Sequence, residues 1–423
     1  IFKRPEVLGF LSLALICLVN SRNRFGALVG GALSISPSGA TDLWRAYFES
    51  WHEVGMGSSL ATPPWVALIA IASLVTLGKV QFFITLFFLI APLLMMWSCF
   101  NLLKKLTDNK WISIPASFLY ALSPVTIAAV GSGKIATLVL LIAMPFVAFL
   151  LHDWRNIEKY RWRKIFAISL LFSLLYAFTL MSFVIALVAA IAISVDNYRE
   201  FARTVDKELF DQRILKRAAI VFIPFLINAP FSCEALVNPN RLLVEPGLLI
   251  PGGGPFAALL GNPGGTDSVP LWLVSPILLI LVISLFSSTH ARPIAEYGFG
   301  ALSLAVLLAS LSISTHGNEG VARVWTGPVL SIATLAAVAA GTAGLGLGTA
   351  KALAAEGVRV VVCGRDQQKL DKAITEIGNG AQGFICDVST DRGGREFVES
   401  AIGLLGSVDI LIANGGGPPP GGF

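Results

Sequence analysis

A run of glycines near the C-terminus has the spacing of a phosphate-binding turn. It lies between an apolar stretch at 335–338 and a helical pattern at 349–356. Glycines between a strand and a helix let backbone amides approach a pyrophosphate at the N-terminus of the helix. A flexible glycine linker is the alternative, but it leaves the regular pattern that follows unexplained. We predict that the residues of this turn that bind a cofactor are Gly341, Thr342, Gly344, Leu345 and Gly346.

The elements needed to position such a turn follow it at regular intervals. Strand patterns at 358–363, 384–386 and 408–413 alternate with helical patterns at 367–377 and 396–405. This alternation predicts a parallel sheet with helices on its faces. With 335–338 as the first strand, we predict a partial Rossmann-like fold, which is a doubly wound parallel sheet with strands in the order 3-2-1-4.

Four segments resemble the short-chain dehydrogenase/reductase family, especially its 3-oxoacyl-carrier-protein reductase-like branch. They are GTAGLGLGTAKALAAEG, VVVCGRD, CDVS and LIANGGGPPPG. The glycine motif of that family usually begins with Thr-Gly, where this chain has Ala339 and Ala340. The resemblance implies an NADP-dependent oxidoreductase, with its cofactor-binding part in residues 334–423.

The same resemblance implies roles for residues outside the glycine turn. Arg365 follows the second strand, where NAD enzymes of the family place an acid, and its cation suits the 2′-phosphate of NADP. Asp387 is expected beside the adenine. Asn414 and Gly415 belong to a variant of the family's Asn-Asn-Ala-Gly motif and complete the predicted cofactor site.

The resemblance implies a truncated reductase. It covers only the first part of the family's length, and the family's catalytic Ser, Tyr and Lys lie beyond Phe423. We therefore assign no catalytic residue and expect weak NADP binding without reductase activity, because general acid catalysis lacks its donor. Since residue 1 is Ile rather than Met, we also expect a fragment at the N-terminus.

The rest of the chain has the composition of a membrane protein. Hydrophobic residues make up 55% of the chain and charged residues only 13%, where soluble domains carry about 25% charged residues. Residues 1–335 hold 24 Lys and Arg against 17 Asp and Glu, whereas residues 336–423 hold 7 against 9. The positive excess belongs to the apolar part, where cations lie near anionic lipid, and nothing indicates a nucleic-acid partner. We predict a polytopic α-helical membrane domain at 1–333, followed by the truncated domain at 334–423.

The apolar stretches predict about eight to eleven crossings of a cell membrane. Cations concentrate at Lys104–Lys110, Arg155–Lys164 and Asn197–Arg217, which the positive-inside rule places in the cytoplasm with the C-terminal domain. This arrangement requires a hairpin at Ile165–Val195. The same rule places Asp42–Thr62 in the cytoplasm too, although its aromatic content favours the outside, and the sequence leaves that conflict open. For Tyr198–Leu215, an interfacial amphipathic helix and a solvated loop are both compatible with the pattern.

Aromatic and acidic residues gather in the segment Asp42–Ser59. Trp44, Tyr47 and Trp51 stand among carboxylates, a combination that suits a sugar or a lipid-linked sugar. An interfacial aromatic belt explains the same residues and is the favoured alternative. A second long segment, Asn238–Pro270, is rich in Gly and Pro and has the length of a functional lid.

The apolar part carries few ionisable residues and no pattern of metal ligands. Lys79 and Lys134 stand at breaks between spans, which argues against an ion-coupled transporter. The run WRAYFESWHEVGMGSSLATPPW and the spans that follow it as far as Arg323 resemble the multi-span portion of actinobacterial family-2 glycosyltransferase-like envelope proteins. The resemblance covers residues 1–330. That family carries its catalytic domain and DxD-type metal site before the spans, so the resemblance implies a non-catalytic membrane portion here.

The two parts compete for the same residues. The segment Val324–Ala340 is too short to supply both a span of about 20 residues and a strand of about 5 to 6. Three interpretations follow: a reductase fragment behind an unrelated membrane piece, a glycan-assembly membrane protein with an adventitious tail, or a membrane-anchored reductase, which is the least favoured. We expect Leu335–Ala339 to form the central strand, because both of its edges would then be hydrogen-bonded.

Overall fold

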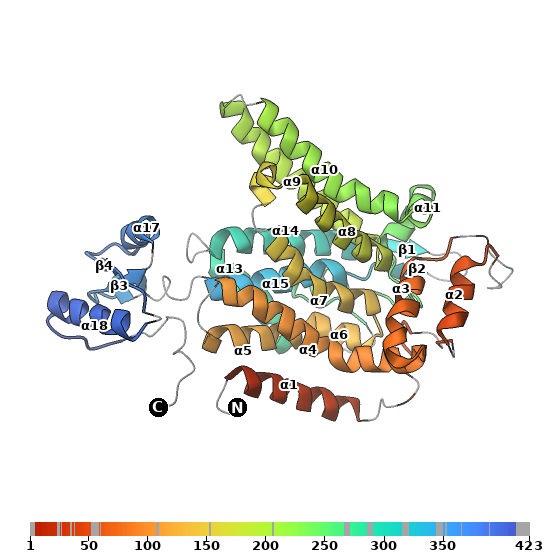
Figure 1. Ribbon diagram of the computed structural model, residues 1–423, viewed down its shortest axis with the longest axis horizontal. Coiled ribbons are helices and arrows are strands. Elements are labelled where there is room, and N and C mark those ends of the chain that lie inside the picture. The colour runs from red at the N-terminus through yellow and green to blue at the C-terminus, as the bar shows by residue number, and fades with distance from the viewer. Residues whose placement is uncertain are drawn as a thin grey trace.

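A computed structural model describes most of residues 5–411. Outside the described part lie residues 1–4, 23–25, 27, 34–35, 38, 52–58, 60, 107–109, 152–153, 205–206, 266–270, 286–290, 315–320, 344–349, 352, 365, 389 and 412–423. Figure 1 shows a large helical bundle and a smaller α/β unit near the C-terminus.

The bundle is built from apolar helices, as its composition requires. Its longer helices are α1 (Pro5–Ser21), α4 (Val80–Leu106), α5 (Lys110–Ala121), α7 (Ile135–Leu150), α8 (Trp162–Phe178), α9 (Met181–Thr204), α10 (Lys207–Ile227), α13 (Leu271–Leu285), α14 (Ala291–Ala309) and α15 (Gly327–Ala343). Shorter elements are α2 (Ala40–Phe48), α3 (Trp65–Ala72), α6 (Pro124–Gly131), α11 (Phe231–Val237), α12 (Pro255–Leu259), the 3₁₀ helices η1 (Ser73–Thr76), η2 (Trp154–Lys159) and η3 (Pro239–Leu243), and the antiparallel strands β1 (Ser312–Ser314) and β2 (Val321–Arg323).

Helix α4 runs through the core and sets the length of the bundle. Its 27 residues correspond to about 40 Å, which matches a bilayer with its headgroups. It packs against α5 and α7, and its side chains Met95, Met96 and Cys99 are fully buried. Ile165–Val195 forms two helices, α8 and α9. Arg217 of α10 contacts both Trp154, before α8, and Ser194, 13 residues after the start of α9, so α8 and α9 run in opposite directions as the predicted hairpin requires.

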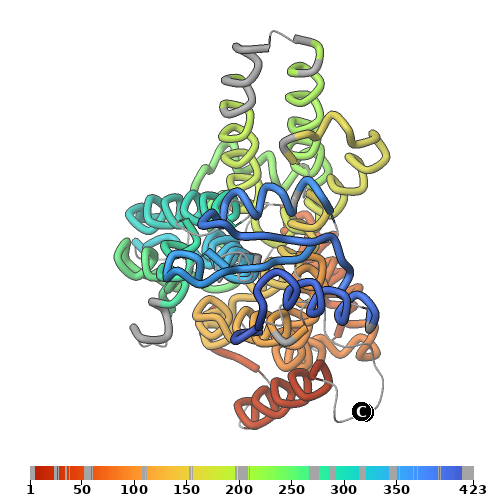
Figure 2. Tube along the Cα trace, turned by 90° about the vertical axis from the view of Figure 1, so that its left-hand side faces the viewer, coloured from red at the N-terminus to blue at the C-terminus, as the bar shows by residue number. Residues whose placement is uncertain are grey.

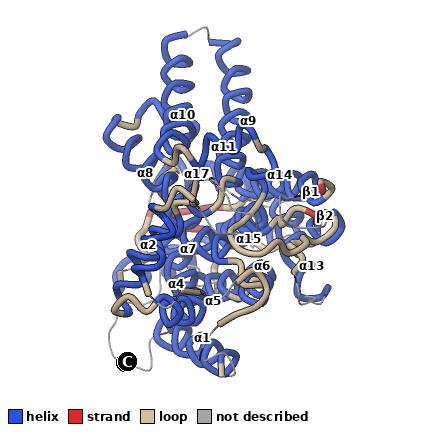
Figure 3. Tube along the Cα trace, turned by 90° about the vertical axis from the view of Figure 1, so that its right-hand side faces the viewer, coloured by secondary structure: helices blue, strands red, loops and turns tan. Residues whose placement is uncertain are grey.

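The two ends of α4 separate the basic loops from the aromatic segment. Lys105, at the C-terminal end, lies with its Nζ 3.5 Å from the centre of the Phe149 ring, so the ends of α4 and α7 meet beside η2. At the other end, Ala40 bonds to Gly78 just before α4 begins, and α2 packs against α3. The segment that begins at Asp42 therefore lies at the end opposite Lys105 (Figure 1), because α3 and η1 stay at that end. The placement of Asp42–Thr62 beside the basic loops does not hold in this structure. Figure 3 shows loops and strands β1 and β2 at the end where α2 lies.

The segment Tyr198–Leu215 is neither a single amphipathic helix nor a loop. It divides between the end of α9 and the start of α10, which project together from the bundle (Figure 1). The rings of Tyr198 and Phe210 lie 5.9 Å apart, one on each helix, and hold the two helices side by side.

Two described helices are long and apolar enough to cross a membrane. They are Val80–Leu106 and Ile112–Gly131, the latter joining α5 and α6, and the bent pair α10–α11 makes a possible third. Six further apolar helices, counted within the described residues, are 17 residues or shorter. Eight to eleven crossings would need these shorter helices, so that number stays a prediction.

Residues 335–343 form a helix and not the expected strand. Helix α15 continues from Gly327 to Ala343 and packs against α13 and α14. Leu335, Ala336 and Ala337 are buried in the bundle core. The expectation that Leu335–Ala339 would be the central strand is therefore wrong. Alanine has the highest helix propensity, and packing of this small-residue face against two helices outweighs strand pairing.

The C-terminal unit contains part of the predicted sheet. Strands β3 (Val361–Gly364) and β4 (Gln382–Ile385) pair in parallel, joined through α17 (Gln367–Ile377), and α18 (Asp391–Leu405) follows. Figure 2 shows this unit in blue in front of the bundle. The predicted strands at 358–363 and 384–386 are confirmed with shifted bounds. Residues 408–411 are not a strand, and the rest of the predicted fourth strand lies outside the described residues.

Candidate functional site: the edge of the C-terminal sheet

Strands β3 and β4 end at the same edge, where the predicted adenosine contacts follow them. Gly364 pairs with Ile385, and the amide of Cys386 donates to the carbonyl of Gly364 at 3.1 Å. Arg365 is the next residue after β3, and Asp387 comes two residues after β4. In open α/β sheets, ligands bind beyond the carboxyl ends of parallel strands. The topology thus brings Gly364, the residue before Arg365, to the same edge as Asp387, and Arg365 itself lies outside the described residues.

Asp387 begins a tight connection from β4 to α18. Its carbonyl accepts hydrogen bonds from the amide and the hydroxyl of Thr390, at 3.2 Å and 3.0 Å. The Thr390 hydroxyl caps α18 by accepting from the amide of Gly393. A Cβ at Gly393 would come within 2.2 Å of the Asp387 carbonyl oxygen, so this approach needs a glycine. The backbone of Asp387 is fixed by the turn, and the residue is exposed at the edge.

Helix α17 covers one face of the strand pair. Leu370 is buried, and a Cβ built at Gly383 would lie 3.0 Å from its side chain. Lys351, in the helical residues before β3, pairs with Glu376 of α17 at 2.9 Å. Burial, together with a hydrogen bond to Cys386, raises the pKa of the Cys363 thiol to about 12, so this thiol stays protonated and unreactive.

The glycine turn is not assembled among the described residues. Gly341 and Thr342 lie inside α15, where the Thr342 hydroxyl donates to the carbonyl of Ala339 at 2.9 Å. The other predicted residues of the cofactor site lie outside the described part: Gly344, Leu345, Gly346, Arg365, Asn414 and Gly415. The described residues therefore supply only the end of β3 and the turn at Asp387 of the predicted cofactor site. They do not form the pyrophosphate cradle, because the strand that should precede it is helical.

Comparisons with known proteins bear on the same part of the chain. Residues 334–423 match the short chain dehydrogenase family. A granaticin polyketide synthase protein of Streptomyces violaceoruber, named as a ketoacyl reductase, is 38% identical over 85 residues, which are 19% of this chain and 31% of that protein. Dehydrogenase/reductase SDR family member 4 of Homo sapiens is 36% identical over 83 residues, 19% of this chain and 30% of the relative. Short-chain dehydrogenase/reductase SDRA of Arabidopsis thaliana is 34% identical over 88 residues, 20% of this chain and 35% of the relative.

The short-chain dehydrogenase segment is thus only part of what its relatives contain. The chain spans about a third of the length of the curated relatives that it matches. No solved structure matches the chain. The family match supports a Rossmann-like fold, an oxidoreductase class and a nicotinamide cofactor for residues 334–423. It begins at residue 334, inside α15, so the residues that the family uses as its first strand belong to a bundle helix here.

The comparisons give no support to the glycosyltransferase resemblance of the bundle. The aromatic segment proposed to bind a sugar is partly helical, since Trp44 and Tyr47 of α2 lie partly buried against the bundle core. A carboxylate oxygen of Asp42 accepts from the amide of Gly39 at 3.3 Å at the start of this helix. Trp44 and Asp42 therefore have structural contacts. Residues 52–58 of the segment lie outside the described part.

A second polar cluster lies inside the bundle, and sequence analysis missed its acid. Glu245 is 4% exposed, and its Oε1 accepts from the Thr137 hydroxyl at 2.6 Å. The indole of Trp325 donates to the same hydroxyl at 2.9 Å, and the Lys134 ammonium lies 5.4 Å from the Trp325 ring centre. Oε2 of Glu245 is buried and has no hydrogen-bond partner among the described residues. Lys134 was identified from the sequence as an isolated cation, but its buried counterpart is distant in the chain.

The segment that carries Glu245 is docked closely on the bundle. The amide of Gly252 donates to Arg323, and a Cβ at Gly252 would come within 2.0 Å of the Val324 carbonyl oxygen. Leu248 donates to Ala32, which in turn donates to Ser132 beside Lys134. Of the lid predicted at Asn238–Pro270, the described residues contain η3 and α12 and lie against the bundle. The glycines are needed for close approach of the backbone.

Proposed function

We propose that residues 334–423 are the NADP-binding portion of a short-chain reductase that acts on carbonyl groups of the 3-oxoacyl type. The observation that carries the proposal is the parallel pair β3–β4, whose strands end at one edge, one residue before Arg365 and two residues before Asp387 in the chain. A bound nicotinamide cofactor would supply hydride chemistry to the complete reductase. The described part of the chain would contribute the sheet edge at the ends of β3 and β4, where the adenosine of the cofactor would bind.

The choice of NADP over NAD depends on Arg365. A carboxylate at the end of the second strand accepts from the ribose 2′-hydroxyl of NAD, whereas an arginine suits the 2′-phosphate of NADP. A guanidinium can bind a phosphate with two parallel hydrogen bonds, and the charges assist the contact. Asp387, by the same proposal, lies beside the adenine.

Cofactor titration of the purified chain tests this proposal. We expect Arg365→Asp to weaken NADP binding by at least tenfold relative to NAD, because a single charge-assisted contact is worth about 1.5–3 kcal/mol. Arg392→Asp is the matched control, since Arg392 is exposed on α18. Equal effects of Arg365→Asp on both cofactors would exclude Arg365 as the phosphate contact.

We also propose that these 423 residues bind the cofactor without reducing a carbonyl. NADPH oxidation coupled to a 3-oxoacyl substrate would contradict this second proposal.

We propose, second, that residues 1–333 lie in a cell membrane with the α/β unit in the cytoplasm. The observation behind it is the 27-residue helix α4, which has Lys79 directly before it and Lys104 and Lys105 in its last turn, with an apolar run between these cations. A role in envelope glycan assembly, with a lipid-linked sugar at Asp42–Ser59, rests on the sequence resemblance alone. Extraction of the chain from cell membranes by detergent and not by carbonate tests the membrane placement.

A further inference from the structure

Two cationic side chains of α10 bind the 3₁₀ helix η2 and the residue that follows it. Lys216 donates to the carbonyls of Glu158 and Tyr160 at 2.6 Å and 2.9 Å. Arg213 pairs with the carboxylate of Glu158 at 2.9 Å. Both cationic residues are only 8% exposed. Their hydrogen bonds therefore fix the path of the chain from η2 into α8.

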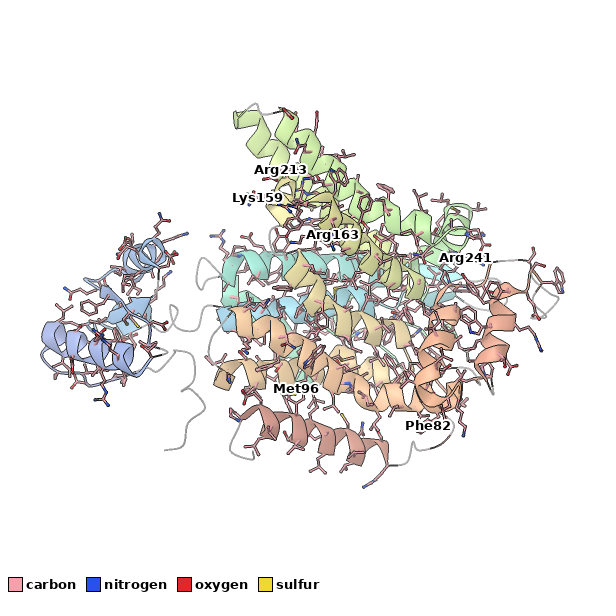
Figure 4. All side chains as sticks on the ribbon, in the orientation of Figure 1. Phe82, Met96, Lys159, Arg163, Arg213 and Arg241 are labelled. Atoms are coloured by element: carbon pink, nitrogen blue, oxygen red, sulfur yellow. The ribbon has the colours of Figure 1, made fainter. Side chains whose placement is uncertain are left out.

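The outer surface of this connection is uniformly cationic. Lys159, Arg161 and Arg163 are exposed, and the Lys164 ammonium lies 3.3 Å from the centre of the Tyr160 ring. Glu158 is the one carboxylate between residues 154 and 164, and Arg213 already neutralises it. Figure 4 shows Lys159, Arg163 and Arg213 close to the base of the α9–α10 projection. The fixed backbone thus presents three exposed cations, Lys159, Arg161 and Arg163, that form no ion pair with a described residue.

An exposed apolar stripe begins at the same place. Trp162, at the start of α8, is 43% exposed. The stripe continues along α8 at intervals of four residues through Phe166, Leu170 and Leu174, which are 54%, 66% and 41% exposed. Residues four apart lie on one face of a helix, so these side chains form a continuous apolar track. A soluble anion makes no apolar contact with such a track, whereas the acyl chain of a lipid can pack along it.

The position of this surface in the bundle agrees with a membrane boundary. Residue 154 follows the end of α7 directly, and α7 ends beside Lys105 of α4. Lys104 and Lys105 are exposed at this end as well. Trp and Tyr collect at the headgroup level of a bilayer, and cations there contact anionic lipid. Trp162, which is exposed, has that position at the start of the apolar track.

We propose that Lys159, Arg161 and Arg163 form a binding site for the headgroup of an anionic phospholipid, with its acyl chains along Trp162 and Phe166. The site rests on the proposed placement of the bundle in a bilayer. Recognition combines charge attraction to the phosphate with apolar contact below it. Each Lys or Arg near an anionic surface contributes roughly a factor of five to binding, so the three together contribute about 100-fold.

Native mass spectrometry of the full chain in detergent tests the site, with phosphatidylglycerol and phosphatidylcholine added in equal amounts. We expect preferential binding of phosphatidylglycerol. The triple variant Lys159→Gln, Arg161→Gln, Arg163→Gln should lose about 100-fold of that preference. The matched control is Lys372→Gln, Arg392→Gln, Arg395→Gln, which removes three exposed cations from the α/β unit and should keep the preference.

Several outcomes would overturn the lipid site. Equal binding of both lipids by the parent chain, or equal loss in the two triple variants, would contradict it. Displacement of phosphatidylglycerol by millimolar inorganic phosphate would show that the cations bind a free anion instead. Binding of neither lipid would contradict the bilayer placement of the bundle, and with it this site.

Discussion

At the scale of single residues, the buried Glu245 carboxyl determines how the bundle responds to pH. Burial raises the pKa of Glu245 to about 7, although the Lys134 ammonium and the Thr137 hydrogen bond both act to lower it. Burial also lowers the pKa of Lys134, against the opposing effect of Glu245. The folded chain thus holds the Glu245 proton more tightly than the unfolded chain, whose carboxyl titrates near 4.5.

This shift predicts a bundle that loses stability as the pH rises. The contribution of Glu245 is fully present below about pH 4.5 and is lost as the pH rises through about 7. In the parent, we expect the free energy of unfolding to fall by about 1–3 kcal/mol across this window, and we expect Glu245→Gln to remove that fall. The measurement is the free energy of unfolding in detergent at intervals between pH 5 and 8.

Glu296→Gln is the control for this pH dependence. Glu296 lies on the surface of α14 in an exposed pair with Arg292, and such pairs contribute little. The control should retain the slope of the parent. A parent chain whose stability is flat between pH 5 and 8 would show that Glu245 is not buried as described.

Sequence analysis recovered residues whose neighbours are close in the chain and missed those whose neighbours are distant. The helix predicted at 396–405 is present as α18, but it begins at Asp391, five residues earlier, after a Thr390 cap that the sequence analysis did not identify. Thr137 bonds to Glu245, 108 positions further on, and to Trp325, 188 positions further on. No periodicity connects residues at such separations, so the buried polar cluster is visible only after folding.

At the scale of elements, the small α/β unit depends on a few side chains. Leu370 of α17 is 4% exposed and lies against Gly364 of β3 and Gly383 of β4. We expect Leu370→Ala to destabilise this unit by about 2–4 kcal/mol, through lost burial and a residual cavity. Hydrogen exchange of peptides from 358–385 should rise, while peptides from α4 and α7 stay unchanged.

Gln368→Ala on the exposed side of α17 is the control for Leu370→Ala. It should leave exchange in both parts of the chain near that of the parent. If Leu370→Ala raised exchange equally in α4, the two units would fold as one and the separate description of the α/β unit would fail.

The type of element at 335–343 could not be settled from periodicity. A short apolar run suits a buried strand and a buried helix equally well. The expectation of a strand came from the glycines that follow, whereas the alanines at 336, 337, 339 and 340 favour a helix. Contacts with α13 and α14, which a sequence does not reveal, decide the competition.

At the scale of the whole molecule, the bundle has two chemically different ends. The cations of 104–105 and 159–163 lie at one end, and the segment with Trp51 lies at the other. We predict that a cysteine at Lys104 reacts with an impermeant maleimide only from the cytoplasmic side, and a cysteine at Trp51 only from the opposite side. The assay uses sealed vesicles and a parent chain whose five cysteines are replaced by alanine. Labelling of both positions from one side would contradict the opposite location of the two ends. It would support the positive-inside placement of Asp42–Thr62 on the cytoplasmic side.

Residues 334–343 belong to the bundle helix α15 and not to the sheet of the short-chain dehydrogenase segment. A Cβ at Gly341 would lie 3.1 Å from the side chain of Ile280 in α13, so cysteines at these two positions fall within crosslinking reach. If the segment were instead the central strand, a cysteine at Ala337 would lie beside one at Val362 of β3.

Crosslinking of these two cysteine pairs, each in the cysteine-free parent, distinguishes the helix from the strand. We predict that Ile280→Cys with Gly341→Cys crosslinks with a short bifunctional maleimide, and that Ala337→Cys with Val362→Cys does not. The reverse result, with the second pair crosslinked and the first pair not, would show that residues 335–339 form the central strand of the sheet.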